Sequence, residues 1–572
     1  MRFTLLSVAA FVPALLGAQD APKPAPVPIV PAPASSLPLK LAAKPTKSAI
    51  SVEDLMTRLY IFADDSMMGR DAGTKGNAMG TDYLAAEVKR MGLVPMGENG
   101  TFFQTLPLKD RTFDPMSSLI AGGASLEYAK EWIALGTATL NKPDLEVVYG
   151  GALGDTVHLS AAQAAGKLVV LNVPLNSPSI NRAIVGSGLV PEGAAAVMLV
   201  MPPQVLPAIQ GALKTQLKMF TDDGTIETRV FLASTAVNKF FAKPLDSLTL
   251  GAVGAKAQLN SVITATPIQH PARNVIALLR GSDPKLKGQY VAVGAHNDHV
   301  GMSPKAFDHD SMRIMTHIVR PGGAEDNGKR ASPEQQTEIN AQLAEWRKTN
   351  PSRMDSTFNG ADDDGSGSVS VLEIAEYMAS LKVKPKRSTL FVWHVGEEKG
   401  LWGSEWFTDH PTVPRDSIVA QLNMDMVGRG NAWDVTGATK EGATLHGTPD
   451  YLQVIGSRRL STELGDLVET VNTTGKHKLT FDYSLDANGH PMNIYCRSDH
   501  YEYARYGIPI AFFTTGGHSD YHQLTDEPQY IDFPHMMRVA KFVSDAAMTI
   551  GNLDHRIVVN QPKPNPKGVC QQ

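Results

Sequence analysis

Cysteine is scarce in this sequence, since only Cys496 and Cys570 occur among 572 residues. Two cysteines make no disulfide framework, and the second lies in a tail rich in Pro, Lys and Gln, so the sequence leaves their pairing open. Cysteine is also too rare to build a thiolate metal site. A metal ion bound here needs His and carboxylate ligands, which suit zinc and other first-row ions at hydrolytic sites.

An excess of charge of either sign is also missing. The chain has 53 basic and 58 acidic side chains, for a net charge of -5. We therefore expect no nucleic acid partner and no binding of a membrane surface. Hydrophobic residues make up 42% of the 572 residues, which is a globular composition, and domains usually hold roughly 100–200 residues, so two or three domains are expected.

Long hydrophobic runs are missing beyond the amino terminus. Residues 1–18 contain a positive charge at Arg2, an apolar stretch over Leu5–Leu16, and small residues at Gly17 and Ala18. The apolar stretch is shorter than the roughly 20 residues of a membrane span, so the pattern predicts a cleaved signal peptide. An N-terminal anchor is the alternative. We expect a secreted or periplasmic protein without membrane contact after cleavage.

The remaining chain divides into segments of different composition. Residues 19–48 are rich in Pro, Ala and Lys and predict an extended linker. Residues 49–107 have helical patterns and begin the main domain. In residues 108–262, short apolar runs alternate with Gly, Pro and Asp, which predicts a β-rich insert without a cluster of His and acids. The main domain resumes over 263–553, and 554–572 form a C-terminal tail.

Residues 263–553 alternate between strand and helix patterns, which predicts an α/β fold. We expect a three-layer α/β/α sandwich with a largely parallel mixed sheet, in which ligands bind at the carboxyl ends of the strands. The expected strands are Asn274–Leu279, Tyr290–Gly294, Thr389–Val395, Ile418–Asp425 and Ile508–Thr514, and the expected helices of the main domain are Met79–Met91, Val369–Leu381 and Pro534–Ile550, with a further helix starting near Ser51.

His296 and Asp298 come directly after the apolar run Val291–Ala295. Residues two apart in an extended segment face the same side, so the Asp298 carboxylate is expected beside the imidazole of His296. Carboxylates in that position fix the tautomer of metal-bound histidines. The alternative is a buried hydrogen-bonded pair without a metal.

Three consecutive acids, Asp362, Asp363 and Asp364, precede a predicted helix. Adjacent carboxylates repel one another unless a cation or a helix N-terminus compensates, so the run favours either a metal ligand or a helix cap. Asp362–Glu373 also has the spacing of an EF-hand calcium loop. An EF-hand needs a helix leading into its first position, and the preceding residues break helices, so calcium is the weaker alternative.

Glu397 and Glu398 end a strand that should be buried in the sheet. Burial of two carboxylates is costly unless they are paired or bound to a cation. Metal-dependent hydrolases use two such acids, one as a ligand and one that takes a proton from metal-bound water. A solvated strand end is the alternative.

Asp425 lies in an apolar strand pattern, and His522 follows the apolar run Pro509–Phe513. An unpaired Asp inside a strand costs free energy, which makes Asp425 a candidate ligand. His522 is a candidate because it should lie at a strand end. The chain thus offers an imidazole or a carboxylate at the end of several strands. A carboxylate that bridges two ions roughly 3.5–4 Å apart is a recognised hydrolytic arrangement.

The order of these motifs resembles the di-zinc exopeptidases of peptidase clan MH, which include aminopeptidase Y, bacterial leucyl aminopeptidases and the glutamate carboxypeptidase II group. The resemblance spans about 263–553 and rests on Gly294–His299, Gly360–Gly367, Gly396–Leu401, Asn423–Asp425 and Asp520–His522. It extends to Gly69–Thr74 and Met91–Leu93, and the 108–262 insert stands where many members carry a protease-associated domain.

The resemblance implies a role for each of eight residues. His296 and Asp425 would bind one Zn²⁺, Glu398 and His522 a second, and Asp363 would bridge the two ions. Glu397 would be the general base, Asp298 would orient His296, and Tyr521 would stabilise the oxyanion. Residues 302–358, with a helix expected over Glu334–Lys348, are longer than the family's usual connection.

These expectations together predict a secreted zinc-dependent exopeptidase, an aminopeptidase with a peptide substrate, and leave its oligomeric state open. A carboxypeptidase of the same family is one alternative. The others belong to different classes, namely a calcium-binding protein and a non-catalytic receptor-like domain. Retention of all candidate ligands and of Glu397 argues against the receptor-like domain.

Overall fold

A computed structural model describes residues 37–572 except 115, 136–138, 175–182, 184–188, 208–217 and 221–228. The signal peptide expected over 1–18, and the expected linker as far as residue 36, lie outside the described residues. Within the part that is described, no helix has the length and apolar character needed to cross a membrane. Residues 37–48 contain no helix or strand, and Leu37 and Leu41 pack against the core that follows.

The described chain divides into two compact units. One contains residues 107–268, and the other contains residues 37–106 together with 269–572. The insert expected over 108–262 falls within the first unit. We call residues 107–268 the small unit and the remainder the main unit, and each is described by itself.

The small unit is built mainly of strands. One sheet has the order β6-β12-β10-β9-β8, in which the last four strands are parallel and β6 is antiparallel. These strands are β6 (Trp132–Leu135), β8 (Val147–Ala152), β9 (Leu168–Asn172), β10 (Ala196–Met201) and β12 (Arg229–Ala233). A second sheet, β5-β4-β13-β7, contains β4 (Ser118–Ala121), β5 (Ala124–Ser125), β7 (Leu140–Leu145) and β13 (Ala257–Ser261), and a third, β11-β3-β14, contains β3 (Leu108–Phe113), β11 (Lys218–Phe220) and β14 (Ile263–Pro267).

The main unit contains a mixed sheet of nine strands with the order β1-β15-β19-β16-β20-β25-β23-β24, and β2 also pairs with β15. The four central strands β19, β16, β20 and β25 run parallel, so their carboxyl ends meet at one edge. The strands are β1 (Val94–Pro95), β2 (Phe103–Thr105), β15 (Arg273–Leu279), β16 (Tyr290–His296), β19 (Ser388–His394), β20 (Ile418–Met424), β23 (Tyr451–Ile455), β24 (Thr480–Asp482) and β25 (Ile510–Thr514).

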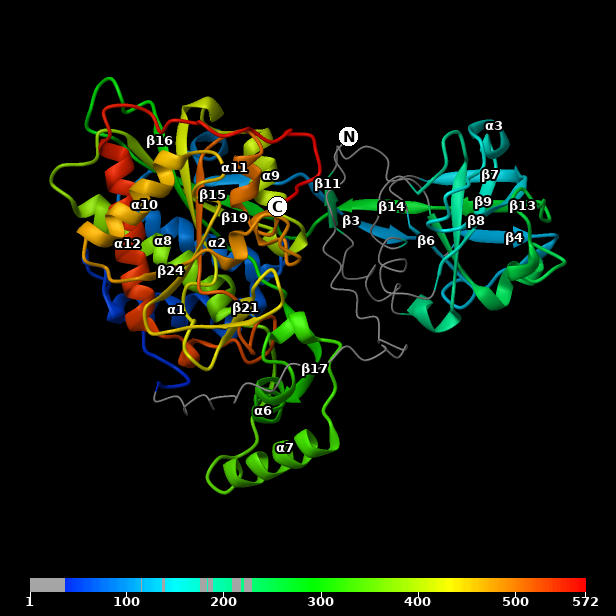
Figure 1. Ribbon diagram of the computed structural model, residues 1–572, viewed down its shortest axis with the longest axis horizontal. Helices are drawn as coiled ribbons and strands as arrows, with labels where there is room; N and C mark the ends of the chain where they lie inside the picture. The colour runs from blue at the N-terminus through cyan, green and yellow to red at the C-terminus, as the bar shows by residue number, and fades with distance from the viewer. Residues whose placement is uncertain are drawn as a thin grey trace. The chain divides into compact units, whose positions relative to one another are not determined.

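Helices cover both faces of this sheet (Figure 1). Alternate residues of β16 point to opposite faces, so Val291 and Val293 join one apolar core and Ala292 joins the other. The first core also contains side chains of α1 (Val52–Phe62), α2 (Lys75–Arg90), α8 (Gly367–Ser380), α10 (Thr462–Thr474) and α12 (Phe533–Asn552). The second contains side chains of α9 (Trp402–Asp409) and α11 (His500–Ala504). The expected three-layer α/β fold is confirmed.

Residues 302–358 form their own substructure in the main unit. It consists of β17 (Met302–Asp308), α6 (His309–Val319), α7 (Pro333–Trp346) and β18 (Met354–Thr357), and β17 pairs with β18. In Figure 1 the helices α6 and α7 project from the body of this unit. The helix expected over Glu334–Lys348 corresponds to α7, which Ser332 caps through its side chain and Pro333 begins.

Two helices begin earlier than expected. The helix expected from Met79 starts at Lys75, because the side chain of Thr74 accepts a hydrogen bond from the Asn77 backbone and caps a polar first turn. The helix α8 starts at Gly367, directly after the turn Ala361–Ser366 that carries the three acids. Polar first turns lack the apolar periodicity from which helix starts were inferred.

The structure shows how the two cysteines pair. Cys496 and Cys570 form a disulfide across 74 residues of sequence. The bond ties the tail to the short turn Ile494–Cys496. The tail also buries Ile557 against the main core.

Candidate metal centre

The carboxyl edge of the parallel strands gathers the ionisable side chains of the candidate site. His296 is the last residue of β16, Asp425 follows β20 directly, and Glu397 and Glu398 follow β19 in a short turn. Because these strands are parallel neighbours, the side chains at their ends meet. His522 comes from the loop after β25.

Asp363 lies at the centre of this group. Its Oδ1 is 3.1 Å from Nε2 of His296, and its Oδ2 is 2.9 Å from Nε2 of His522. The two carboxylate oxygens therefore face two different histidines. The peptide bond between Asp363 and Asp364 is cis.

The first ligand group consists of His296, Asp363 and Asp425. Oδ1 of Asp425 lies 3.6 Å from Nε2 of His296, and all three side chains are buried. The hydroxyl of Ser498 donates a 2.7 Å hydrogen bond to the other oxygen of Asp425. That bond leaves Oδ1 turned toward the histidine.

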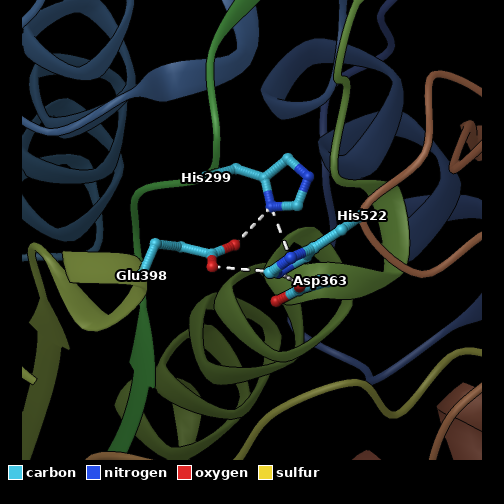
Figure 2. Close-up of side chains that lie close together, drawn as sticks. All are labelled: His299, Asp363, Glu398 and His522. Atoms are coloured by element: carbon cyan, nitrogen blue, oxygen red, sulfur yellow. Dashed lines mark ion pairs between the residues drawn. The ribbon is translucent and has the colours of Figure 1, made fainter. Parts of the chain in front are cut away.

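The second ligand group consists of His299, Asp363, Glu398 and His522 (Figure 2). Oε2 of Glu398 is 2.9 Å from Nε2 of His522, and Oε1 of Glu398 is 2.8 Å from Nδ1 of His299. Asp363 belongs to both groups, as the expected bridging position requires. His299 was part of the motif but had no role assigned to it.

Several polar atoms of these groups are buried yet make no hydrogen bond within the described structure. They are Nε2 of His296, Nδ1 of His299, Oδ2 of Asp363 and Oε1 of Glu398. Each lies within 4 Å of another member, so the atoms are close but do not point along a hydrogen bond. Such orphaned atoms are expensive unless they converge on a cation. A metal ion fits both groups.

The charges of the centre are strongly coupled. Burial opposes the charge of Glu398, yet the neighbouring His522 lowers its pKa to about 2. Glu398 and Asp363 in turn raise the pKa of His522 to about 10 despite its burial. For His296, burial lowers the pKa, and the carboxylate of Asp425 overcomes this and raises it well above its usual range. The protons on these imidazoles are the charges that a bound cation replaces.

The neighbours of Asp363 bind backbone rather than the centre. Oδ2 of Asp364 accepts a 3.0 Å hydrogen bond from the backbone N–H of His296, and Oδ1 of Asp362 accepts a 2.6 Å bond from Gly428. Both therefore hold the loops in place. Glu373, the last position of the EF-hand alternative, lies in α8 and pairs with Arg58 at 2.9 Å. Glu373 belongs to neither group of candidate ligands, so the structure does not form the calcium-loop arrangement.

Asp298 supports a turn of the site. Its carboxylate accepts hydrogen bonds from the backbone N–H groups of Gly396 at 2.7 Å and Glu397 at 3.2 Å. Its Oδ1 is 3.8 Å from Nδ1 of His296, which instead contacts the main-chain carbonyl of Asp298 at 3.1 Å. Asp298 thus lies beside His296 as expected, but its carbonyl makes the hydrogen-bond contact and its carboxylate positions the two glutamates.

Glu397 and Tyr521 face a pocket next to the ligand groups. Burial raises the pKa of Glu397 well above its usual range, and burial does the same for Tyr521. The pocket has about 630 Å³ of empty space, part of it open to solvent, and its lining includes Asp363, Asp425 and His522 as well as these two residues. The ring of Tyr521 lies 4.1 Å from that of His522.

The lining of this pocket also contains apolar side chains and an ion pair. The apolar side chains are those of Met426, Leu485, Met492, Ile494 and Phe512. The ion pair joins Arg497 to Glu325 at 2.5 Å. Glu325 belongs to the 302–358 substructure, whose Ala324 also donates a 3.0 Å hydrogen bond to the carbonyl of Tyr521.

Sequence reasoning missed four residues of this site, namely His299, Ser498, Arg497 and Glu325. His299 had a signal, because it lies three residues after His296 in the loop after a buried strand. The other three come from segments without strand or metal-ligand spacing. Only the tertiary fold brings them to the sheet edge.

Fold and site together define an α/β protein with a candidate metal centre at the carboxyl edge of its sheet. The family model of peptidase family M28 matches residues 346–547 of this chain. This match contains Asp363, Glu398, Asp425 and His522, whereas His296 lies before it.

Similar proteins include two fungal proteins named leucine aminopeptidase 1. The one from Uncinocarpus reesii is 30% identical over 203 residues, covering 34% of this chain and 44% of that protein. The one from Sclerotinia sclerotiorum is 31% identical over 192 residues, covering 32% and 44%. The chain thus spans less than half of these relatives. Among solved structures, an aminopeptidase from Aneurinibacillus sp. strain AM-1 aligns over 90% of this chain and 97% of its own, with 16% identity and a TM-score of 0.45.

Proposed function

We propose that this protein is a secreted zinc-dependent exopeptidase, an aminopeptidase that removes N-terminal residues from peptides with two zinc ions. The observation that carries the proposal is the position of Asp363, whose two oxygens face His296 at 3.1 Å and His522 at 2.9 Å. A carboxylate shared by two ligand groups matches the hydrolytic two-metal arrangement. The M28 domain and the names of the fungal relatives support the peptidase class.

The chain supplies ligands for two ions. His296, Asp363 and Asp425 would hold one, and Asp363, Glu398 and His522 would hold the other. Zinc, when bound at such a site, polarises a carbonyl and acidifies a water molecule. Imidazole and carboxylate donors suit zinc, which agrees with a sequence that has only two cysteines.

Glu397 is suited to move protons in this pocket. Its carboxyl group lines the pocket, and burial raises its pKa well above the usual range. A carboxylate with a raised pKa can take a proton from an attacking water and return it to the departing amine. The hydrogen bonds from Gly396 and Glu397 to Asp298 fix the turn that carries Glu397.

Tyr521 and the apolar lining serve the substrate. Because burial keeps the Tyr521 hydroxyl protonated, it can donate a hydrogen bond to the oxygen of the scissile carbonyl. The apolar side chains of the pocket, such as Met426 and Phe512, favour an apolar residue at the cleaved end of the peptide.

The experiment compares a leucine anilide that has a free amino group with its N-acetylated form and with an N-blocked peptide that has a free carboxyl end. We expect hydrolysis of the free-amine substrate alone, loss of activity after chelation, and recovery with Zn²⁺. Cleavage of only the N-blocked peptide would identify a carboxypeptidase instead. Failure of all three substrates in a sample with bound zinc would overturn the exopeptidase proposal.

A further inference from the structure

His299 is a buried histidine that the functions described so far do not use. It follows β16 by three residues and has no exposed surface. Its backbone N–H donates to the carbonyl of Arg70, and the Arg70 guanidinium is itself held by the carbonyls of Phe62, Asn359 and Gly360. The backbone that carries the imidazole is therefore held in place.

The Nδ1 edge of the His299 ring faces the other members of the second ligand group (Figure 2). Nδ1 lies 2.8 Å from Oε1 of Glu398 and 3.7 Å from Oδ2 of Asp363. The ring centre is 5.4 Å from that of His522, and the two rings are nearly perpendicular at 72°. Nδ1 of His299 and the other three donor atoms all lie within 4.8 Å of one another.

Two simpler roles for His299 fit these contacts poorly. If it donated a hydrogen bond to Glu398, the 2.8 Å contact would have hydrogen-bond geometry, yet Nδ1 of His299 and Oε1 of Glu398 have no hydrogen-bond partner among the described residues. If it only packed, both ring nitrogens would stay buried without a partner, which costs free energy. Convergence of Nδ1 and Oε1 on a common point removes both difficulties.

We propose that Nδ1 of His299 is a fourth protein ligand of the metal ion that Asp363, Glu398 and His522 hold. This deepens the proposed function and rests on it. The second group then offers two imidazoles and two carboxylates, whereas the first offers only His296, Asp363 and Asp425. Four protein ligands fill a tetrahedral zinc site, and three leave a position open for water or substrate.

The consequence is a functional difference between the two ions. An ion held by His299 as well as Asp363, Glu398 and His522 would be bound more tightly and exchange ligands less readily. An ion held by His296, Asp363 and Asp425 would keep a position for water or substrate, and a chelator would remove it first. The pocket that contains Glu397 is lined by Asp425 of the first group, by His522 of the second and by the shared Asp363.

X-ray absorption at the zinc edge tests the proposal on the wild-type protein loaded with zinc. Three imidazoles shared by two ions give about 1.5 per ion, whereas two imidazoles give about 1.0. Because the count is made on the wild type, it does not depend on a variant that folds. A value near 1.5 supports the proposal, and a value near 1.0 with two bound ions overturns it.

The His299→Gln variant adds a second readout, which is zinc affinity measured by competition with a chelator. We expect the tighter of the two sites to weaken at least tenfold, since changes beside a metal ligand alone cost about 10–100-fold. His500→Gln is the matched control, because His500 is also fully buried in the main unit and its Nε2 contacts the carbonyl of Tyr495. Its zinc affinities should equal those of the wild type.

The outcomes separate the two proposals. A wild-type protein that binds no zinc would remove the proposed function together with this inference. Two bound ions with unchanged affinity in His299→Gln would remove only the inference, and the five expected ligands would stand alone. Loss of the tight ion in His299→Gln, with both ions retained in His500→Gln, supports the ligand role.

Discussion

The two units of this molecule contain parallel strands, yet they bury very different side chains. In the main unit, the carboxyl edge of the sheet buries His296, Asp363 and Asp425 among other charged groups. In the described part of the small unit, Arg229 and Ser261 are the buried polar residues, and the rest of its core is apolar. A parallel sheet therefore does not form a metal site by itself. The site depends on acids and histidines in the loops that follow its strands.

This difference has a physical cost that points to function. Buried charges contribute little to stability compared with apolar residues of the same volume. In the described part of the small unit, a sheet forms with Arg229 as its buried charged residue and no buried acid or histidine. The charges at the edge of the main sheet thus need an explanation other than folding, and metal binding supplies one.

The largest expected effect comes from Asp363→Asn. It removes the one carboxylate that both ligand groups share, so both ions should bind more weakly and turnover should fall beyond the about 10²–10⁴-fold that loss of a general base causes. Metal analysis and hydrolysis of a leucine anilide measure both effects. Asp362→Asn and Asp364→Asn are controls that should keep both ions, since these acids bind backbone. Two retained ions in Asp363→Asn would contradict the bridging role.

Glu397→Gln should give the next largest effect. Turnover should fall by about 10²–10⁴-fold while zinc content stays the same, because the proposed function assigns proton transfer to Glu397 and metal binding to Glu398. Steady-state kinetics together with metal analysis test this. If zinc is lost and activity remains, the roles of Glu397 and Glu398 have been exchanged.

Acid should destabilise the main unit through Glu527. Burial would raise the pKa of this carboxyl group, but the neighbouring His309 and the hydrogen-bonded Arg353 lower it from 4.5 to about 2. A lowered folded-state pKa stabilises the protein above the unfolded pKa, and this stability is lost as pH falls through the folded value. Between pH 5 and 2 the free energy of unfolding should fall by about 3 kcal/mol more in wild type than in Glu527→Gln.

Urea unfolding followed at several pH values measures this slope. His309 adds nothing to it, because its pKa is raised above the ordinary value and it stays protonated throughout the window. Equal slopes in the two proteins would show that Glu527 titrates normally.

The smallest effect is expected in the small unit. Asp144 pairs with Lys256 at 2.8 Å, and both side chains are about two-thirds exposed, at 65% and 66%. Exposed pairs contribute little. Asp144→Asn should leave the urea midpoint, its pH dependence and the zinc content unchanged. A clear loss of zinc in this variant would break the division between the two units.

Much of the fold could be predicted from local patterns. The strand expected over Tyr290–Gly294 and the helix over Pro534–Ile550 each lie within two residues of the observed element, because their apolar residues recur at the period of the element. The start of α2 at Lys75 was missed because its first turn is polar and depends on the cap at Thr74.

The site could be predicted where its residues end strands. His296, Glu398 and Asp425 follow buried strands, and the parallel order brings them to one edge. Glu325 and Ser498 were beyond reach, since they meet the site only through tertiary contacts with Arg497 and Asp425. The pairing of Cys496 with Cys570 likewise spans 74 residues and leaves no local signature.

The disulfide links the oxidation state of the two cysteines to the pocket beside the candidate metal centre. Cys496 ends the turn that begins with Ile494. The next residue, Arg497, lines the pocket, and Ser498 donates a hydrogen bond to Asp425. The side chain of Gln572 accepts a hydrogen bond from the Tyr495 backbone, so the tail is also hydrogen-bonded to this turn. We expect a preparation made under reducing conditions to keep its sheet edge and its candidate metal ligands but to lose the covalent bond between the tail and this turn. On the proposed function, we expect such material to bind as much zinc as the oxidised protein and to bind substrate more weakly.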